Sequence, residues 1–170
     1  RPRTYDVPPD QYRQLTTMWI TPTGKRSRVT NEFVYNKTPL APVDYKGTAK
    51  GLKYKLFTGE FSSVDQLSTA AVIDTGVALS FNTTAFKTNM HGFGVIYTGY
   101  IHIDTDGNYG FSLASANGSS LSIDDQPVVD NDGKHGVYDQ GGTVPLLKGF
   151  HNITIKYFDA GSSGILSAFM

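Results

Sequence analysis

The 170-residue sequence contains no cysteine, which excludes disulfide bonds, thiolate ligands for metals and cysteine nucleophiles. It also has no excess of charge, because 15 Lys and Arg residues balance 15 Asp and Glu residues. Without a net charge, the chain has no overall electrostatic field that would attract nucleic acid or an anionic membrane surface. We therefore expect no nucleic acid among its partners.

Long hydrophobic runs are also missing. No stretch approaches the ~20 consecutive apolar residues that a membrane-spanning helix requires, so we expect no membrane insertion. Residues 1–10 have neither the apolar core nor the cleavage site of a signal peptide. The chain begins with Arg1 and ends with the apolar run 165–170, and we interpret it as a piece of a longer protein.

The residues that are present favour strands and turns over helices. Hydrophobic residues make up 39% of the chain, less than the usual share of about 45–50%, and glycine occurs 18 times. From Val77 onward, apolar residues alternate with polar ones, as at Tyr109, Phe111 and Leu113. Turn signals separate these runs at 106–107, 117–118, 132–133 and 148–149. This pattern predicts an all-β fold, an antiparallel β-sandwich.

The first part of the chain predicts a separate element. Runs 12–20 and 29–35 flank a turn at 22–25 and predict one β-hairpin, and the following segment 38–42 contains prolines but no periodic pattern. We divide the chain into the terminal hairpin of a preceding domain at 1–37, a proline-rich linker at 38–43 and the sandwich at 44–170.

Two local patterns in the sandwich region predict individual elements. A capping signal at Ser62 or Ser63 predicts one short helix over 64–67, the only regular helix that we expect. Val77, Leu79 and Phe81 have the spacing of one apolar face of a strand.

Six blocks of sequence carry a resemblance to a known family. In chain order they are FGVIYTGYI at 93–101, GNYGFSL at 107–113, GSSLSID at 118–124, VVDNDGKHG at 128–136, VPLLKG at 144–149 and HNITIKYF at 151–158. In these blocks the chain resembles the PA14 family, and with an earlier block at 51–67 the resemblance covers about three quarters of the sequence. The family implies a β-sandwich, usually non-catalytic, attached to secreted glycosidases, proteases, toxins and adhesins and often credited with binding carbohydrate.

The resemblance also bears on calcium. In the lectin-like fungal adhesins of this family, an Asp-Asp pair ahead of Gly-Ser coordinates a calcium ion that holds sugar hydroxyls. Ala116 and Asn117 occupy the corresponding positions here, so both negative charges are absent. We therefore expect no cofactor, and Asp124 and Asp130 are the remaining candidates for calcium ligands.

The candidate carbohydrate-binding residues lie in the family blocks around turns. They are Asn117, Asp130, Asn131, Asp132, His135 and Tyr138. The alternative for the aspartates is turn formation, because Asp bonds local backbone, and for His135 and His151 it is structural hydrogen bonding. Tyr100, Tyr138 and Phe150 fall near turns, where an exposed ring could stack on a sugar. The close carboxylate pairs Asp104 with Asp106 and Asp130 with Asp132 lie in turns that contain glycine, and we interpret them as turn formers rather than as a glycosidase pair. The sequence shows no serine nucleophile or zinc pattern, so we assign no catalytic residue.

The N-terminal hairpin is similar to the end of the fibronectin-like domain that follows the catalytic barrel of bacterial β-N-acetylhexosaminidases. This resemblance implies that the chain is the C-terminal region of a bacterial glycoside hydrolase that is secreted, periplasmic or on the cell surface. We expect a non-catalytic accessory domain whose partner is a glycan or the catalytic domain of the parent enzyme. The alternatives are a calcium-dependent adhesin or lectin domain and, third, an independent enzyme.

Overall fold

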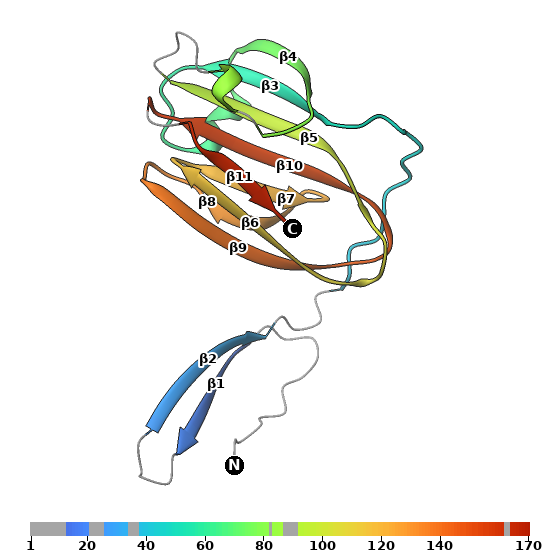
Figure 1. Cartoon of the computed structure of the whole chain (residues 1–170), viewed down its shortest axis with the longest axis vertical. Helices are drawn as coiled ribbons and strands as arrows, with labels where there is room; N and C mark the ends of the chain where they lie inside the picture. The colour runs from blue at the N-terminus through green and yellow to red at the C-terminus, as the bar shows by residue number, and fades with distance from the viewer. Residues whose placement is uncertain (1–12, 21–25, 34–37, 82, 87–91, 162–163) are drawn as a thin grey trace. The chain divides into compact units, whose positions relative to one another are not determined.

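The computed structural model describes residues 13–20, 26–33, 38–81, 83–86, 92–161 and 164–170. The chain divides into two compact units, Arg1–Pro39 and Leu40–Met170. In the first unit, β1 (Arg13–Ile20) and β2 (Arg26–Phe33) form an antiparallel hairpin in which Arg13 lies opposite Phe33 (Figure 1). The predicted hairpin is thereby confirmed, while its predicted turn at 22–25 lies outside the described residues.

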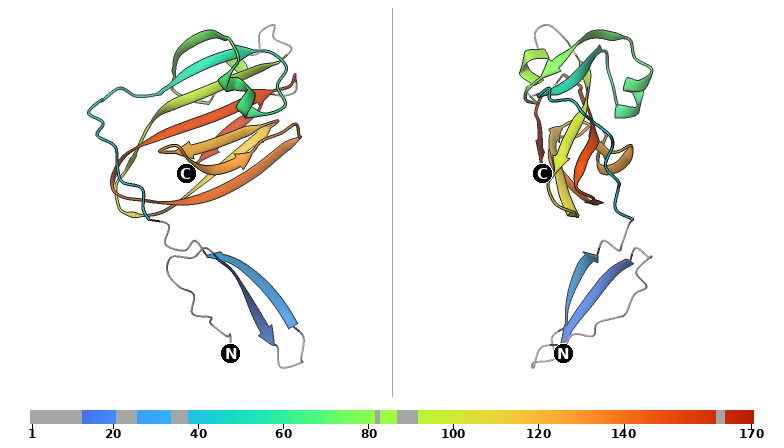
Figure 2. Two further views of the ribbon diagram at one scale, coloured as in Figure 1. Left: turned by 180° about the vertical axis from the view of Figure 1, so that it is seen from behind. Right: turned by 90° about the vertical axis from the view of Figure 1, so that its right-hand side faces the viewer.

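The second unit consists of two antiparallel sheets. A six-stranded sheet has the order β4-β3-β5-β10-β7-β8, and a three-stranded sheet has the order β11-β6-β9 (Figures 1 and 2). The strands are β3 (Leu52–Thr58), β4 (Val72–Ala78), β5 (Phe93–Ile103), β6 (Gly107–Ala116), β7 (Ser119–Ile123), β8 (Gln126–Asn131), β9 (Val137–Leu146), β10 (Gly149–Asp159) and β11 (Leu166–Phe169). The prediction of an all-β antiparallel sandwich is confirmed.

The core lies between the two sheets and is built by alternating side chains. Val95 and Tyr97 of β5 and Ile155 of β10 face Leu113 of β6 and Leu146 of β9, and all five are almost fully buried. Burial of a side chain of this size stabilises the fold by roughly 1.5–3 kcal/mol. Because the inner side of each strand packs into this core, the outer side of the six-stranded sheet faces away from it.

A smaller cluster covers one end of that outer side. The 3-10 helix η1 (Val64–Ser68) packs Val64 and Leu67 against Phe57 and Phe158. The predicted regular helix is therefore a single 3-10 turn, which suits a helical segment of only five residues. The predicted N-cap is confirmed at Ser63, whose side chain accepts a hydrogen bond from the N–H of Asp65 at 3.2 Å.

The strand predicted from Val77, Leu79 and Phe81 is wrong in position and in face. β4 ends at Ala78, and Val77 and Leu79 are 62% and 83% exposed. The reason is the register with β3, which places Val77 opposite Lys53 and hence on the outer side of the sheet. Periodicity fixes which side chains share a face, but only pairing decides where that face points.

The segment predicted to be a linker is bonded to the sandwich from Leu40 onward. The Leu40 N–H donates to the Pro145 carbonyl at 3.0 Å, and the Val43 N–H donates to the Phe150 carbonyl at 2.8 Å. The division into domain remnant, linker and sandwich stays a prediction. Within the described residues, no helix has the length and apolarity required to cross a bilayer.

Candidate functional site

Most of the residues predicted to bind carbohydrate meet at one end of the sandwich, where the turn between β6 and β7 meets the loop between β8 and β9. We call Asn117, Asn131, Asp132, His135 and Tyr138 the loop cluster. Asn117 follows β6 with a φ of 68°, a left-handed conformation that Asn tolerates. Its N–H donates to the His135 carbonyl at 3.0 Å, and its side-chain amide donates to Asp159 at 3.4 Å.

The polar groups of the loop cluster are largely used inside the protein. The buried Asn131 side chain donates to the Tyr138 carbonyl and to the Ser115 hydroxyl, each at 3.1 Å. Both ring nitrogens of His135 face carbonyl oxygens, those of Asn131 at 2.9 Å and Gly136 at 2.6 Å. This arrangement supports the alternative of structural hydrogen bonding for His135.

Asp132 ties the loop cluster to η1. Its carboxylate accepts hydrogen bonds from the Ser63 hydroxyl at 2.6 Å and from the Val64 N–H at 2.9 Å. The neighbouring Gly118 leaves the room for this contact, since a Cβ there would lie 2.4 Å from an Asp132 oxygen. Asp132 therefore holds two elements together and has little capacity left for a ligand.

Two of the predicted carbohydrate-binding residues remain on the surface. Tyr138 is 59% exposed, with its ring centroid 5.3 Å from that of His135. Asp130 is exposed and accepts a hydrogen bond from the Asp132 N–H at 3.1 Å. These are the only parts of the prediction that the structure leaves open to a glycan, among the six residues proposed.

The remaining candidates for calcium ligands do not converge. Asp124 lies in the turn between β7 and β8, whereas Asp130 lies opposite Ser120 of β7, four positions before Asp124, or roughly 13 Å along the strand. Both oxygens of Asp124 are occupied, one by the Nδ1 atom of His151 at 2.6 Å and the other by the Asn152 N–H at 2.8 Å. The described residues contain no group of three or more His, Asp or Glu side chains able to hold a metal ion.

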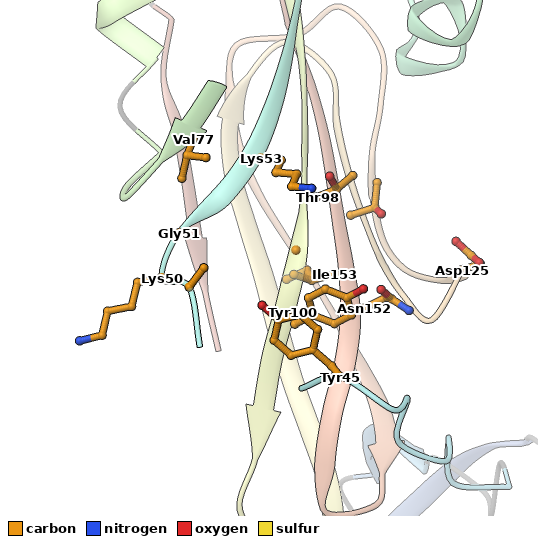
Figure 3. Close-up of a pocket in the computed structure, with 13 residues that line it drawn as sticks. Tyr45, Lys50, Gly51, Lys53, Val77, Thr98, Tyr100, Asp125, Asn152 and Ile153 are labelled. Atoms are coloured by element: carbon orange, nitrogen blue, oxygen red, sulfur yellow. The ribbon is translucent and has the colours of Figure 1, made fainter. Parts of the chain in front are cut away.

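A groove of about 500 Å³ lies elsewhere, on the outer side of the six-stranded sheet (Figure 3). We call it the sheet-face groove. It crosses β3, β5 and β10 between the chain segment that precedes β3 and the turn between β7 and β8. It is lined by Tyr45, Ala49, Lys50, Gly51, Lys53, Val77, Thr98, Gly99, Tyr100, Asp125, Asn152, Ile153 and Thr154.

An aromatic stack forms one wall of the sheet-face groove. The rings of Tyr45 and Tyr100 are 3.8 Å apart at 18°, and the edge of Phe150 meets Tyr45 at 5.2 Å. The hydrogen bond between Val43 and Phe150 brings Tyr45 to this position. Tyr100 is nevertheless 42% exposed, so the stack presents a stiff ring to solvent.

Polar side chains lie beside this ring because of the strand register. Asn152 of β10 is directly opposite Tyr100 of β5, and Thr98 of β5 lies between Lys53 and Thr154 in the next row. Figure 3 shows Tyr45, Tyr100 and Asn152 close together, with Lys53 and Thr98 farther along the same side. The groove therefore combines a flat ring with amide, hydroxyl and ammonium groups.

Sequence reasoning found only part of this groove. It singled out Tyr100 and Phe150 as rings near turns. Tyr45 and Asn152 were not among the predicted binding residues, because their place beside Tyr100 depends on pairing between segments that are far apart in the chain.

Known proteins share this fold. The PA14 domain of the antifreeze protein MpAFP superposes with a TM-score of 0.60 at 15% identity, over 74% of this chain and 86% of that one. The PA14 sugar-binding domain of an RTX adhesin gives a TM-score of 0.60 at 18% identity, over 71% and 89%. A β-glucosidase from Kluyveromyces marxianus gives 0.54 at 18% identity, over 71% of this chain but only 16% of the enzyme. No curated protein matches.

The sequence itself decides the family. Residues 48–169 match the PA14 domain family, a range that contains both sheets of the sandwich and the described loop cluster. The identities to the solved structures are low, so those structures support the fold alone. The chain belongs to the PA14 domain family.

Proposed function

We propose that the chain is a non-catalytic carbohydrate-binding domain that accompanies a secreted bacterial glycoside hydrolase, and that it holds glycan in the sheet-face groove. The observation that carries the proposal is the exposed ring of Tyr100, stacked on Tyr45 and opposite Asn152. An aromatic ring packs against the C–H face of a pyranose, while amide and hydroxyl groups bond the sugar hydroxyls.

The carboxylates of the groove support binding without catalysis. Common glycosidases need two carboxyl groups about 5–9.5 Å apart across the scissile bond. Asp125 alone supplies a carboxylate among the residues that line the sheet-face groove. A single exposed carboxylate has no partner for the paired work of acid and nucleophile.

The parent enzyme is the finer part of the proposal. The Kluyveromyces marxianus β-glucosidase contains a segment of this fold within a much longer chain, which is a precedent for attachment to a glycosidase. A β-N-acetylhexosaminidase parent rests on the resemblance of the N-terminal hairpin. Secretion and a bacterial source belong to the same proposal.

The test is affinity electrophoresis of the chain in gels that contain chitosan, chitin oligosaccharide conjugates, laminarin or polygalacturonate. We expect retardation by at least one polymer and a roughly tenfold weaker interaction for Tyr100→Ala, because a stacked ring contributes about 0.5–1.5 kcal/mol beyond its buried area. Tyr138→Ala is the matched control, since Tyr138 is also exposed but belongs to the loop cluster.

Three outcomes contradict the proposal. Loss of binding in Tyr138→Ala with full binding in Tyr100→Ala would move the site to the loop cluster. Loss of binding on addition of a chelator would favour a calcium-dependent lectin. Hydrolysis of a chromogenic hexosaminide by the chain alone would make it an enzyme.

A further inference from the structure

We infer that the sheet-face groove selects glycans whose sugar units carry a negative charge, such as the carboxylate of a uronic acid. The inference rests on the proposed function and adds the class of glycan. It is drawn from the placement of lysines around the exposed Tyr100 ring.

Lysines gather on the side of the sheet that contains the groove. Lys53 and Lys55 alternate on β3 and face outward, and the register places Lys55 in the same row as Ile96 and Lys156. A second hollow of about 400 Å³ adjoins the groove, shares Lys53, Val77 and Thr98 with it and includes Lys55. The outer side of β3 and β10 is thus basic along its open part.

These lysines are not neutralised by the protein. Among the described residues, the only lysine in an ion pair is Lys46, which meets Asp44 at 3.7 Å. Asp125, in the turn after β7, is the carboxylate that lines the groove. Asp74 of β4 lies opposite Leu56, in the row next to that of Lys55, but it accepts a hydrogen bond from the Tyr54 hydroxyl at 2.9 Å. Within the groove, positive charge therefore lies on the β3 side and the negative charge of Asp125 at the turn after β7.

Lys53 has the best position to meet a charged sugar. Its row is two residues from the row of Tyr100 and Asn152, a separation of roughly 7 Å along the strand. A sugar stacked on Tyr100 places its own carboxylate, or that of the next unit, within reach of this long flexible side chain. Lys50 also lines the groove, but its ammonium points away from it in Figure 3.

The strength of this preference follows from exposed ion pairs. Each contributes about 0.2–1 kcal/mol, equivalent to a roughly 1.4- to 5-fold change in affinity. Two or three lysines together then favour an anionic polymer over its neutral counterpart by about tenfold. The preference must shrink as salt is added, because the charges are exposed and screened.

The experiment measures dissociation constants for polygalacturonate and for the same polymer fully methyl-esterified, in which an uncharged methyl ester replaces each carboxylate. Dextran sulfate and dextran form a second pair, in which sulfate replaces carboxylate as the charge. We expect about tenfold tighter binding to the charged member of a pair at low salt. Preference in the dextran pair alone would support the inference with sulfate as the recognised group.

Three variants localise the effect. Lys53→Gln should weaken binding of the charged polymer about threefold, whereas Lys50→Gln, with the same change of charge, should have a smaller effect. Asp125→Asn should strengthen it about twofold by removing a repelling charge. Asn fits that position, because Asp125 has a φ of 63° in a two-residue hairpin turn that favours Asn.

Different results would overturn different statements. Equal affinity for the charged and neutral members of both pairs, with a loss in Tyr100→Ala, would overturn this inference and leave the proposed function standing. Charged polymers that bind Tyr100→Ala as tightly as the wild type would show general adsorption to lysines and would overturn the inference. Binding to no polymer would overturn both.

Discussion

At the scale of single residues, the hydroxyl groups of two buried tyrosines lower the stability of the folded state. The hydroxyls of Tyr97 and Tyr157 lie in the core with no hydrogen-bond partner among the described residues. An unpaired buried hydroxyl costs about 1–3 kcal/mol. We expect Tyr157→Phe to raise the free energy of unfolding by about 1 kcal/mol in urea at pH 7. If Tyr157→Phe instead lowered the free energy of unfolding by more than about 1 kcal/mol, the hydroxyl of Tyr157 would have a hydrogen-bond partner.

The same residues predict how stability depends on alkaline pH. Burial raises the pKa of Tyr97 from 10.0 to about 12, and it raises the pKa of Tyr157 as well. A raised pKa means that the folded protein holds the neutral phenol, so this contribution is complete below pH 10 and is lost as the pH rises toward 12.

Thermal unfolding followed by circular dichroism between pH 8 and pH 12 tests this expectation. The wild type should lose stability steeply above about pH 10, and the double variant Tyr97→Phe with Tyr157→Phe should lose less. Tyr100→Phe is the control, because Tyr100 is exposed and its replacement should leave the profile unchanged. A profile shared by all three proteins would exclude the buried tyrosines as the cause.

At the scale of elements, η1 depends on one carboxylate that lies 68 residues beyond Val64 in the sequence. Asp132 accepts from the Ser63 hydroxyl and the Val64 N–H, and η1 in turn places Leu67 on Phe158. We expect Asp132→Ala to lower the free energy of unfolding by about 2 kcal/mol, since a hydrogen bond to a charged group contributes about 1.5–3 kcal/mol to stability.

Hydrogen exchange should localise this loss. In Asp132→Ala, amides of η1 should exchange faster than the loss of global stability alone explains. The exchange of amides in β5 and β10 should change only by the amount that this global loss explains. Asp130→Ala is the matched control, since Asp130 is exposed and makes one side-chain hydrogen bond, to the Asp132 N–H. An equal loss in both variants would contradict a specific anchor at Asp132.

The elements also show what could be predicted from sequence. Alternation identified Tyr109, Phe111 and Leu113 as the inward residues of β6, because a strand with one buried face has a period of two. It failed for β4, where pairing with β3 turns Val77 outward. For the site, residue type marked Asn131 and Asp132 as ligands, but type does not reveal that internal hydrogen bonds already occupy them.

At the scale of the whole molecule, the proposed site has no local sequence signature. Tyr45 precedes β3, Tyr100 lies in β5 and Asn152 in β10, and only the sheet brings them together. A family motif points instead to the loops, where several polar positions serve the fold. The site on the sheet face therefore becomes visible only in the three-dimensional structure.

The boundaries of the folded unit give the last prediction. The buried core residues of the sandwich all lie between Leu56 and Leu166, and the segment from Leu40 is bonded to β10 and to the end of β9. We expect residues 38–170 to unfold at the temperature of the whole chain and to bind glycan equally well. Residues 48–170, which span the family match, should still fold but bind roughly tenfold more weakly.

The reason for this difference is Tyr45. The shorter chain keeps Tyr100 and Asn152 but loses the ring that stacks on Tyr100 and the Val43–Phe150 hydrogen bond. Without that support, the Tyr100 side chain gains rotamer freedom that binding must remove again. Full affinity in residues 48–170 would show that the stack is dispensable, and unfolding of residues 38–170 would show that the hairpin unit contributes to the stability of the sandwich.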